Sequence, residues 1–247
     1  MIGRVFKRVL RPVPPVLPAM PLPSWDDLRS LPVGEGSLLE EYLFWFGLAA
    51  LLKPRSILEV GTSSGVSALM LLWGASLFDS VARLTTIDIA RSPHVEANFA
   101  KLPALSDRID FLQGDSREIL PRLADEHAPF DLVLLDGSHE YDHVRIEWSL
   151  VQQISDMWIF HDTDQFPGPA RLVREIERGG NHGVWSLQYP MGHQVHDVVA
   201  QARRYHGLYH QQSLPWTKTS SGPGMTLVRR RRLDAIAENL ESGALVS

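Results

Sequence analysis

The stretch Ser56-Ile-Leu-Glu-Val-Gly-Thr-Ser-Ser-Gly-Val-Ser67 decides the fold of this chain. Its first half is a short apolar run that predicts a strand, Gly61 and Gly65 predict a tight turn, and an apolar helical pattern begins at Val66. Such a turn places backbone N–H groups and a helix N-terminus at the carboxyl end of a strand, where a ligand can approach without meeting a Cβ. The stretch therefore predicts the first strand of an open α/β sheet with a cofactor at its tip.

The spacing of the two glycines separates two classes of cofactor. Glycine also occurs where an α/β chain merely turns a corner, so the pair alone is a weak signal. The dinucleotide fingerprint would place a further glycine at position 63, where this chain has Ser63. An NAD-dependent oxidoreductase therefore stays as an alternative with the poorer pattern.

The segment Glu59-Val-Gly-Thr-Ser-Ser-Gly65 resembles the first motif of class I S-adenosylmethionine-dependent methyltransferases. The resemblance implies that the methionine end of the cofactor lies against the glycine turn. It also implies a Rossmann-like, doubly wound α/β fold with a seven-stranded sheet, in which the last strand runs antiparallel between the fifth and the sixth. The cofactor contacts implied in this segment are Glu59, Gly61, Thr62, Ser63 and Gly65.

Composition limits the other possibilities. The 247 residues are 44% hydrophobic and 21% charged, which suits one α/β domain with terminal additions. Asp and Glu outnumber Lys and Arg by 29 to 24, so no basic field is present to attract nucleic acid, and we expect no such partner. The absence of cysteine excludes disulfides and thiolate chemistry and fits a cytoplasmic location, which we expect.

Three regions are expected along the chain. They are an N-terminal arm (1–36) that is basic and then proline-rich, a methyltransferase domain (37–232) and a C-terminal tail (233–247). Lys7, Arg8 and Arg11 interrupt the apolar residues of the arm, so it is no secretory signal, and we expect no integral membrane span in the chain. The arm is expected to pack on the domain or on a second subunit of a homo-oligomer, with a membrane-surface segment as the alternative.

Acidic residues follow the second and third predicted strands. The run Arg83–Asp88 ends in Asp88, which faces the same edge as the glycine turn at a distance suited to the hydroxyls of a ribose. Capping of the next helix is the alternative for this residue. The strand Ile109–Gly114 leads into Asp115, which is expected to cap a helix, and Ser116, which offers a backbone N–H. In the family, the position of Asp115 commonly meets the adenine amino group.

The fourth and fifth predicted strands bring acids and imidazoles to the same edge. Phe130–Tyr141 contains a strand ending in Asp136, followed by His139, and Met157–Asp164 delivers His161 and Asp162. Neighbouring parallel strands lie about 4.8 Å apart, so acids at both tips can share a cation or a substrate hydroxyl.

This pair of motifs resembles the branch of class I methyltransferases that holds sugar O-methyltransferases and cephalosporin-hydroxylase-like proteins, and the metal-dependent catechol type. The resemblance makes Asp136 a magnesium ligand beside the cofactor and His139 the general base. A Glu-Asp pair completes the metal site in that branch, whereas this chain has His161-Asp162. An imidazole is a soft ligand for so hard an ion, so a site of Asp136, Asp162 and His161 for Mg²⁺ or another divalent cation should bind magnesium weakly.

The sequence therefore predicts an S-adenosylmethionine-dependent methyltransferase that modifies a hydroxyl of a small molecule or sugar, with His139 accepting the proton. A methyltransferase-fold protein that binds a ligand without methyl transfer is a further alternative. Strands are expected at Val184–Tyr189 and Gly224–Val228, and the segment between them is expected to contact the acceptor substrate.

Overall fold

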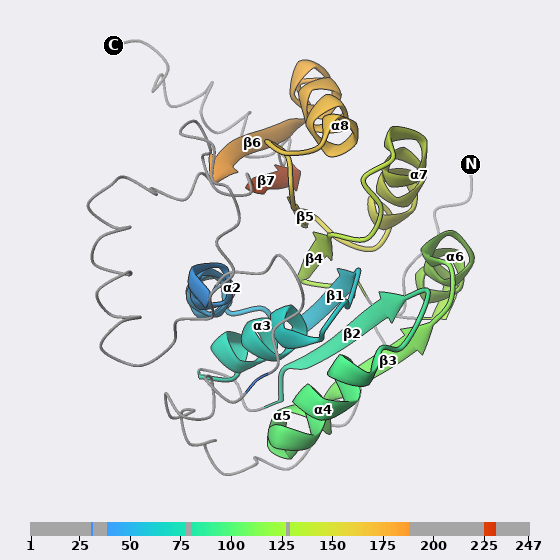
Figure 1. The fold of residues 1–247 in the computed structure, drawn as a ribbon. Helices are drawn as coiled ribbons and strands as arrows, with labels where there is room; N and C mark the ends of the chain where they lie inside the picture. The colour runs from blue at the N-terminus through green and yellow to red at the C-terminus, as the bar shows by residue number, and fades with distance from the viewer. Residues whose placement is uncertain (1–30, 32–38, 78–80, 127–128, 188–224, 231–247) are drawn as a thin grey trace, which may run out of the picture.

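The computed structural model describes Leu31 and residues 39–77, 81–126, 129–187 and 225–230 (Figure 1). The predicted N-terminal arm, apart from Leu31, the acceptor segment between the last two strands and the C-terminal tail lie outside these described residues. Among the helices that are described, none combines the length and the apolar character needed to cross a bilayer.

Helices and strands alternate along the chain. The strands are β1 (Ser56–Val60), β2 (Arg83–Asp88), β3 (Ile109–Gln113), β4 (Leu132–Leu135), β5 (Met157–Phe160), β6 (His182–Leu187) and β7 (Met225–Arg230). The helices are α2 (Leu39–Leu52), α3 (Val66–Ser76), α4 (Pro93–Lys101), α5 (Pro103–Ser106), α6 (Ser116–Glu126), α7 (Tyr141–Val151) and α8 (Pro167–Arg178).

The strands form one sheet in the order β3-β2-β1-β4-β5-β7-β6 (Figure 1). Strands β1 to β5 pair in parallel, whereas β7 runs antiparallel to both β5 and β6. The predicted seven-stranded, doubly wound sheet with its last strand antiparallel is therefore confirmed. The strand order reverses at β1, whose neighbours are β2 and β4, and ligands bind open α/β sheets at such a switch point.

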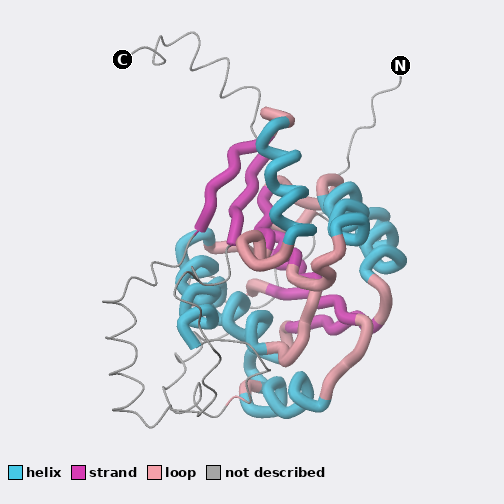
Figure 2. Tube along the Cα trace, turned by 45° about the horizontal axis from the view of Figure 1, so that its top comes forward, coloured by secondary structure: helices cyan, strands magenta, loops and turns pink. Residues whose placement is uncertain are grey.

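Alternate residues of the central strands face opposite helical layers. Ile57 and Leu134 belong to the core beneath α2, α3, α4 and α5, whereas Leu58 and Val133 belong to the core beneath α6, α7 and α8. All four side chains are buried, as expected for central strands covered on both faces. Figure 2 shows the strands as a twisted band between the two layers of helices.

Candidate active site

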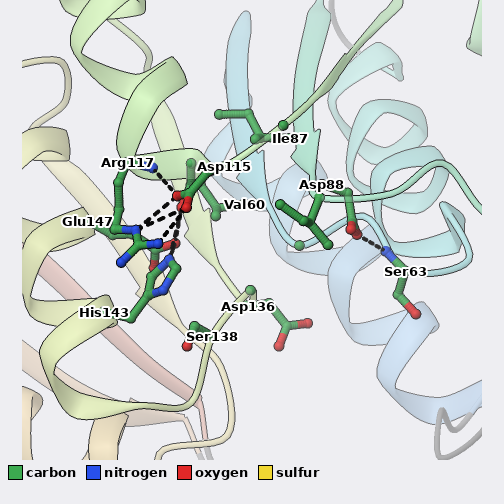
Figure 3. A pocket seen from close by; sticks show the side chains of 15 residues that line it. Val60, Ser63, Ile87, Asp88, Asp115, Arg117, Asp136, Ser138, His143 and Glu147 are labelled. Atoms are coloured by element: carbon green, nitrogen blue, oxygen red, sulfur yellow. Dashed lines mark hydrogen bonds and ion pairs between the residues drawn. The ribbon is translucent and has the colours of Figure 1, made fainter.

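A cavity of about 520 Å³ opens at the carboxyl ends of β1, β2, β3 and β4 (Figure 3). Residues at the ends of these four strands, or shortly after them, line it together with two side chains of α7. The volume lies within the usual range for sites that bind small molecules and cofactors. The cavity therefore lies where the glycine turn predicted a cofactor.

The turn after β1 has the backbone that the sequence predicted. Gly61, Ser63 and Gly65 have φ angles of 98°, 50° and 77°, in the left-handed region. A Cβ at Gly61 would lie 2.2 Å from the carbonyl oxygen of Asp136, so only glycine fits where β1 and β4 end side by side. The turn is therefore fixed both by its own conformation and by the neighbouring strand. Gly61 and Ser63 line the cavity.

Asp88 lies at the cavity and also holds the turn in place. Its Oδ2 accepts the backbone N–H groups of Thr62 and Ser63, each at 2.9 Å, and its Oδ1 accepts that of Ala90 at 3.2 Å. Figure 3 shows its carboxylate beside Ser63 at the edge of the cavity. The residue predicted to bind the ribose is thus oriented by the loop that is predicted to bind the methionine end.

Glu59 supports the turn from behind and does not line the cavity. Its side chain is fully buried and accepts hydrogen bonds from Ser67 Oγ at 2.6 Å and Thr86 Oγ1 at 2.5 Å. The hydroxyl of Thr62 lies 2.6 Å from that of Thr86. Burial raises the pKa of Glu59 to about 8, although the two hydroxyl groups oppose the shift. Gly65, predicted as a further contact, also lies outside the cavity lining, with its Cα next to Phe99.

Asp115 caps α6, as predicted. Its Oδ1 accepts the backbone N–H of Arg117 at 2.9 Å and the side-chain Nε at 3.0 Å, and its Oδ2 lies 2.5 Å from Nη2. These hydrogen bonds lower the pKa of Asp115 to about 2. Both carboxylate oxygens are therefore engaged with Arg117, at the cavity lining. Ser116 lies beside it, and its hydroxyl donates to Oε1 of Glu147 at 2.6 Å.

The sequence did not predict two of the polar groups that line the cavity. His143 and Glu147 are one turn apart on α7, and Nε2 of His143 lies 3.2 Å from Oε1 of Glu147. Burial lowers the pKa of His143 and raises that of Glu147 to about 7, so it disfavours the charged form of both groups. The available signal was the i, i+4 spacing of His and Glu on a helix that starts beside the cleft.

At the edge of the cavity, Asp136 lies with three further side chains from β4, β5 and the loops that follow them. We call this set the acid–imidazole cluster: Asp136, His139, His161 and Asp162. Nδ1 of His161 lies 3.0 Å from Oδ1 of Asp136 and 3.3 Å from Oδ2 of Asp162. Nε2 of His139 lies 3.0 Å from the same Asp162 oxygen and 3.9 Å from Oδ1 of Asp136. The predicted meeting of acids from neighbouring strands is confirmed, because β4 and β5 pair in parallel.

Local packing fixes the members of the cluster. Asp162 has a φ of 56°, and its carbonyl oxygen accepts the N–H of Phe166 at 3.0 Å where α8 begins. The ring of His139 stacks on that of Phe166, with centroids 3.9 Å apart and planes at 5°. A Cβ at Gly168 would lie 2.0 Å from the carbonyl oxygen of His139, so α8 packs directly against the loop that carries this imidazole.

The donor atoms of the cluster suit a divalent cation. Asp136, His161 and Asp162 each offer one ligand atom, and these atoms lie within 4.8 Å of one another. Two carboxylates with an imidazole are a better donor set for Mn²⁺, Fe²⁺ or Zn²⁺ than for Mg²⁺, which prefers oxygen ligands alone. The side chain of Asp136 is 24% exposed, so the cluster is open toward the cavity that this residue also lines.

Comparison with known sequences finds similarity to methyltransferases over the middle of the chain. A family model described as a methyltransferase domain matches residues 58–163. A catechol O-methyltransferase of Mycobacterium tuberculosis is 31% identical over 105 residues, which are 42% of this chain and 45% of that protein. An O-methyltransferase of Aspergillus hancockii is 36% identical over 101 residues, 40% of this chain and 37% of that protein. The chain thus matches less than half the length of either relative.

Comparison with solved structures shows the same fold. An O-methyltransferase from Bacillus cereus in complex with SAH superposes with a TM-score of 0.59 and 18% identity, covering 85% of this chain and 93% of that one. The O-methyltransferase TomG from Streptomyces achromogenes, in complex with SAM, gives 0.57 and 20%, covering 80% and 82%. These comparisons do not confirm the narrower resemblance to the sugar O-methyltransferase branch. Residues 58–163 thus match a methyltransferase domain in sequence, and the whole described sheet has the fold of the two O-methyltransferase structures.

Proposed function

We propose that this protein transfers a methyl group from S-adenosylmethionine to a hydroxyl group of a small molecule. One observation carries the proposal: Asp136 both lines the cavity at the sheet edge and belongs to the acid–imidazole cluster. A cofactor in the cavity would therefore adjoin the groups that can accept a proton. The O-methyltransferase names of the relatives support a hydroxyl as the acceptor.

The cavity supplies what the cofactor needs. The turn at Gly61 lets the backbone approach a bound molecule closely, and the carboxylate of Asp88 can accept hydrogen bonds from ribose hydroxyls. When bound, S-adenosylmethionine supplies a methyl group that its sulfonium already makes electrophilic. The tasks left to the protein are alignment of the acceptor and removal of its proton.

His139 is the residue that we assign to proton removal. Its side chain is 32% exposed, so an acceptor can reach it, and stacking on Phe166 fixes the plane of the ring. The carboxylate of Asp162, 3.0 Å from Nε2, orients the imidazole and stabilises the positive charge that appears when the ring takes up a proton. A histidine held by a carboxylate is a recurring arrangement for general-base catalysis.

A divalent cation would be held by Asp136, His161 and Asp162 and would lower the pKa of a hydroxyl bound to it. The donor set favours a first-row transition metal over magnesium, as argued above.

The NAD-dependent alternative has less support. The antiparallel β7 lies between β5 and β6, whereas the dinucleotide-binding fold has an all-parallel order 3-2-1-4-5-6. Ser63 also occupies the place of the second fingerprint glycine.

Two measurements test the proposal. S-adenosylmethionine and S-adenosylhomocysteine, but not NAD⁺, should raise the melting temperature of the purified protein, because a ligand that binds only the folded state stabilises it. Formation of S-adenosylhomocysteine should then be followed with a panel of phenolic and aliphatic hydroxyl compounds. Stabilisation by NAD⁺ alone would favour the oxidoreductase, and cofactor binding without turnover on any acceptor would favour a non-catalytic binding protein.

A further inference from the structure

At the α6–α7 side of the cavity, three polar side chains meet: Ser116, His143 and Glu147. Figure 3 shows His143 and Glu147 beside each other on α7. Oε1 of Glu147 accepts a hydrogen bond from Ser116 at 2.6 Å and lies 3.2 Å from Nε2 of His143. A Cβ at Gly137 would lie 3.7 Å from the same oxygen, so the carboxyl group lies directly behind this part of the cavity wall.

The second oxygen of this carboxyl group has no protein partner. Glu147 is 1% exposed, and its Oε2 is buried without a hydrogen bond from any residue that the structure describes. A buried carboxyl oxygen without a donor is unfavourable, and such atoms are normally satisfied by a ligand or an ordered water. Because Glu147 lines the cavity, a ligand bound there can supply the donor in place of an ordered water.

Asp115, the residue expected to bind the adenine amino group, is already engaged. Its two carboxylate oxygens accept four hydrogen bonds from Arg117: one from the backbone N–H, two from Nε and one from Nη2. Arg117 directs its Nε and Nη2 to Asp115, and Oε2 of Glu147 has no hydrogen bond from it. Glu147 is therefore the carboxyl group at this end of the cavity that has an oxygen to offer.

We propose that Glu147, rather than Asp115, binds the amino edge of the cofactor's purine base and sets the preference for adenine. The inference rests on the proposed function, because it concerns the S-adenosylmethionine site. It makes Glu147 a specificity residue for the base, held in position by Ser116 on α6 and His143 on α7.

The chemistry of a carboxyl group matches that edge of adenine in either protonation state. The ionised form accepts an N–H of the exocyclic amino group, and the neutral form can in addition donate to the neighbouring ring nitrogen. Asp115, Arg117 and His143 are the charged and titratable groups near Glu147. Burial, with a smaller contribution from the charge of Asp115, raises the pKa of Glu147 to about 7, whereas the hydrogen bond from Ser116 and the charge of Arg117 oppose the shift. The amino group gains an acceptor in both forms, so the interaction does not depend on one ionisation state.

The test compares two ligands on each protein variant by calorimetry: S-adenosylhomocysteine and its 6-deamino analogue, which has a purine without the amino group. The wild-type protein should bind the deamino analogue about 10–100-fold more weakly, the span for a hydrogen bond to a charged group. Glu147→Met has a similar shape but no acceptor, and it should bind both ligands within about threefold. Glu147→Gln keeps one acceptor and should retain part of the preference. It also guards against a folding failure of the Met variant.

Two control variants locate the effect. Asp115→Asn and the exposed Glu118→Gln on α6 should each keep the wild-type preference for the amino group. Equal binding of the two ligands by the wild type would overturn the inference, as would a preference that survives in Glu147→Met or disappears only in Asp115→Asn. If the wild type binds neither ligand, the proposed function itself fails, and this inference fails with it.

Discussion

Nε2 of His139 lies 3.0 Å from Oδ2 of Asp162, the same oxygen that lies 3.3 Å from Nδ1 of His161. One carboxylate oxygen thus lies within 3.3 Å of two imidazole rings, one from the loop after β4 and one from the end of β5. Asp162 would also be one of the three residues that hold a divalent cation, together with Asp136 and His161. The base and metal roles proposed for the cluster therefore both depend on Asp162.

Replacement of His139 tests the base. His139→Ala should reduce turnover by about 10²–10⁴-fold, the usual contribution of a general base, because the acceptor's proton then has no positioned acceptor. Cofactor affinity should be unchanged, since His139 does not line the cavity. Initial rates at saturating S-adenosylmethionine and calorimetry of cofactor binding measure the two quantities. The exposed His94→Ala on α4 is the matched control.

Chelation tests the competing role. If His139 carries most of the proton removal, EDTA should lower turnover by less than His139→Ala does on the same acceptor. Complete loss with EDTA, restored by Mn²⁺ or Zn²⁺, together with a nearly active His139→Ala, would show that the metal carries the step instead.

The cluster should select among cations. Equilibrium dialysis should show tighter binding of Zn²⁺ or Mn²⁺ than of Mg²⁺, because His161 supplies an imidazole where magnesium prefers oxygen. His161→Ala should weaken Zn²⁺ binding at least about tenfold, since even outer-shell partners of a metal contribute that much. His94→Ala again serves as the control. Equal binding of Mg²⁺ and Zn²⁺ by the wild type would contradict the assignment of His161 as a ligand.

Asp88 should contribute to cofactor affinity. Asp88→Ala should weaken binding of S-adenosylmethionine by about 1.5–3 kcal/mol, because hydrogen bonds to a charged group are lost. Asp110→Ala removes the same charge from an exposed position on the neighbouring strand β3 and should leave affinity unchanged. Calorimetry measures the affinity of both variants for S-adenosylmethionine. Wild-type affinity in Asp88→Ala would contradict the assignment of Asp88 to the ribose.

The sequence predicted the strand tips because the signals there are local. A buried run ending in glycine or an acid marks the end of a strand, and parallel pairing then places Asp136 and Asp162 together. His143 and Glu147 gave no such signal, because the face that α7 turns toward the cavity depends on its packing against α6 and the sheet. Glu59 lies two residues after Ile57 on β1, so both side chains point to the face of the sheet that α3 covers. The next residue, Val60, lines the cavity. A strand buried on both faces does not reveal this choice in its sequence.

Glu59 should make stability depend on pH. Its pKa is about 8 in the folded protein against 4.5 as the ordinary value, so ionisation is costly only in the folded state. The neutral form carries no such cost, so stability is full below about pH 4.5 and is lost as pH rises toward 8. Relative to Glu59→Gln, the wild type should therefore lose on the order of 3–5 kcal/mol of unfolding free energy between these pH values.

Urea unfolding of the cofactor-free protein at several pH values between 5 and 9 measures this difference. Groups shared by both proteins, such as Glu147, cancel in the comparison. Glu177→Gln, on the exposed surface of α8, removes a carboxylate without the burial and serves as the control. A constant difference between wild type and Glu59→Gln across this range would contradict the raised pKa.

Gly61 and Gly180 both have a positive φ, but only Gly61 is closely packed, so comparing alanine variants of the two separates the energetic cost of the backbone conformation from that of the packing. Gly180 has a φ of 71° and open space where a Cβ would lie, so Gly180→Ala should cost only the roughly 1–2 kcal/mol of a left-handed alanine. Gly61 has a φ of 98°, and a Cβ would meet the carbonyl oxygen of Asp136 at 2.2 Å. Gly61→Ala should therefore cost about 1–3 kcal/mol more, the range for overpacking.

The contact also predicts a functional difference between these two variants. The tips of β1 and β4 must separate to admit a Cβ at Gly61, which moves the backbone of Asp136 at the boundary between cavity and cluster. Under conditions where both variants remain folded, Gly61→Ala should lose cofactor binding, whereas Gly180→Ala should keep wild-type affinity. Urea unfolding and calorimetry on the pair measure both effects. Equal destabilisation with equal affinity would mean that the turn tolerates the extra atom, and that the approach of β1 to β4 does not shape the cofactor site.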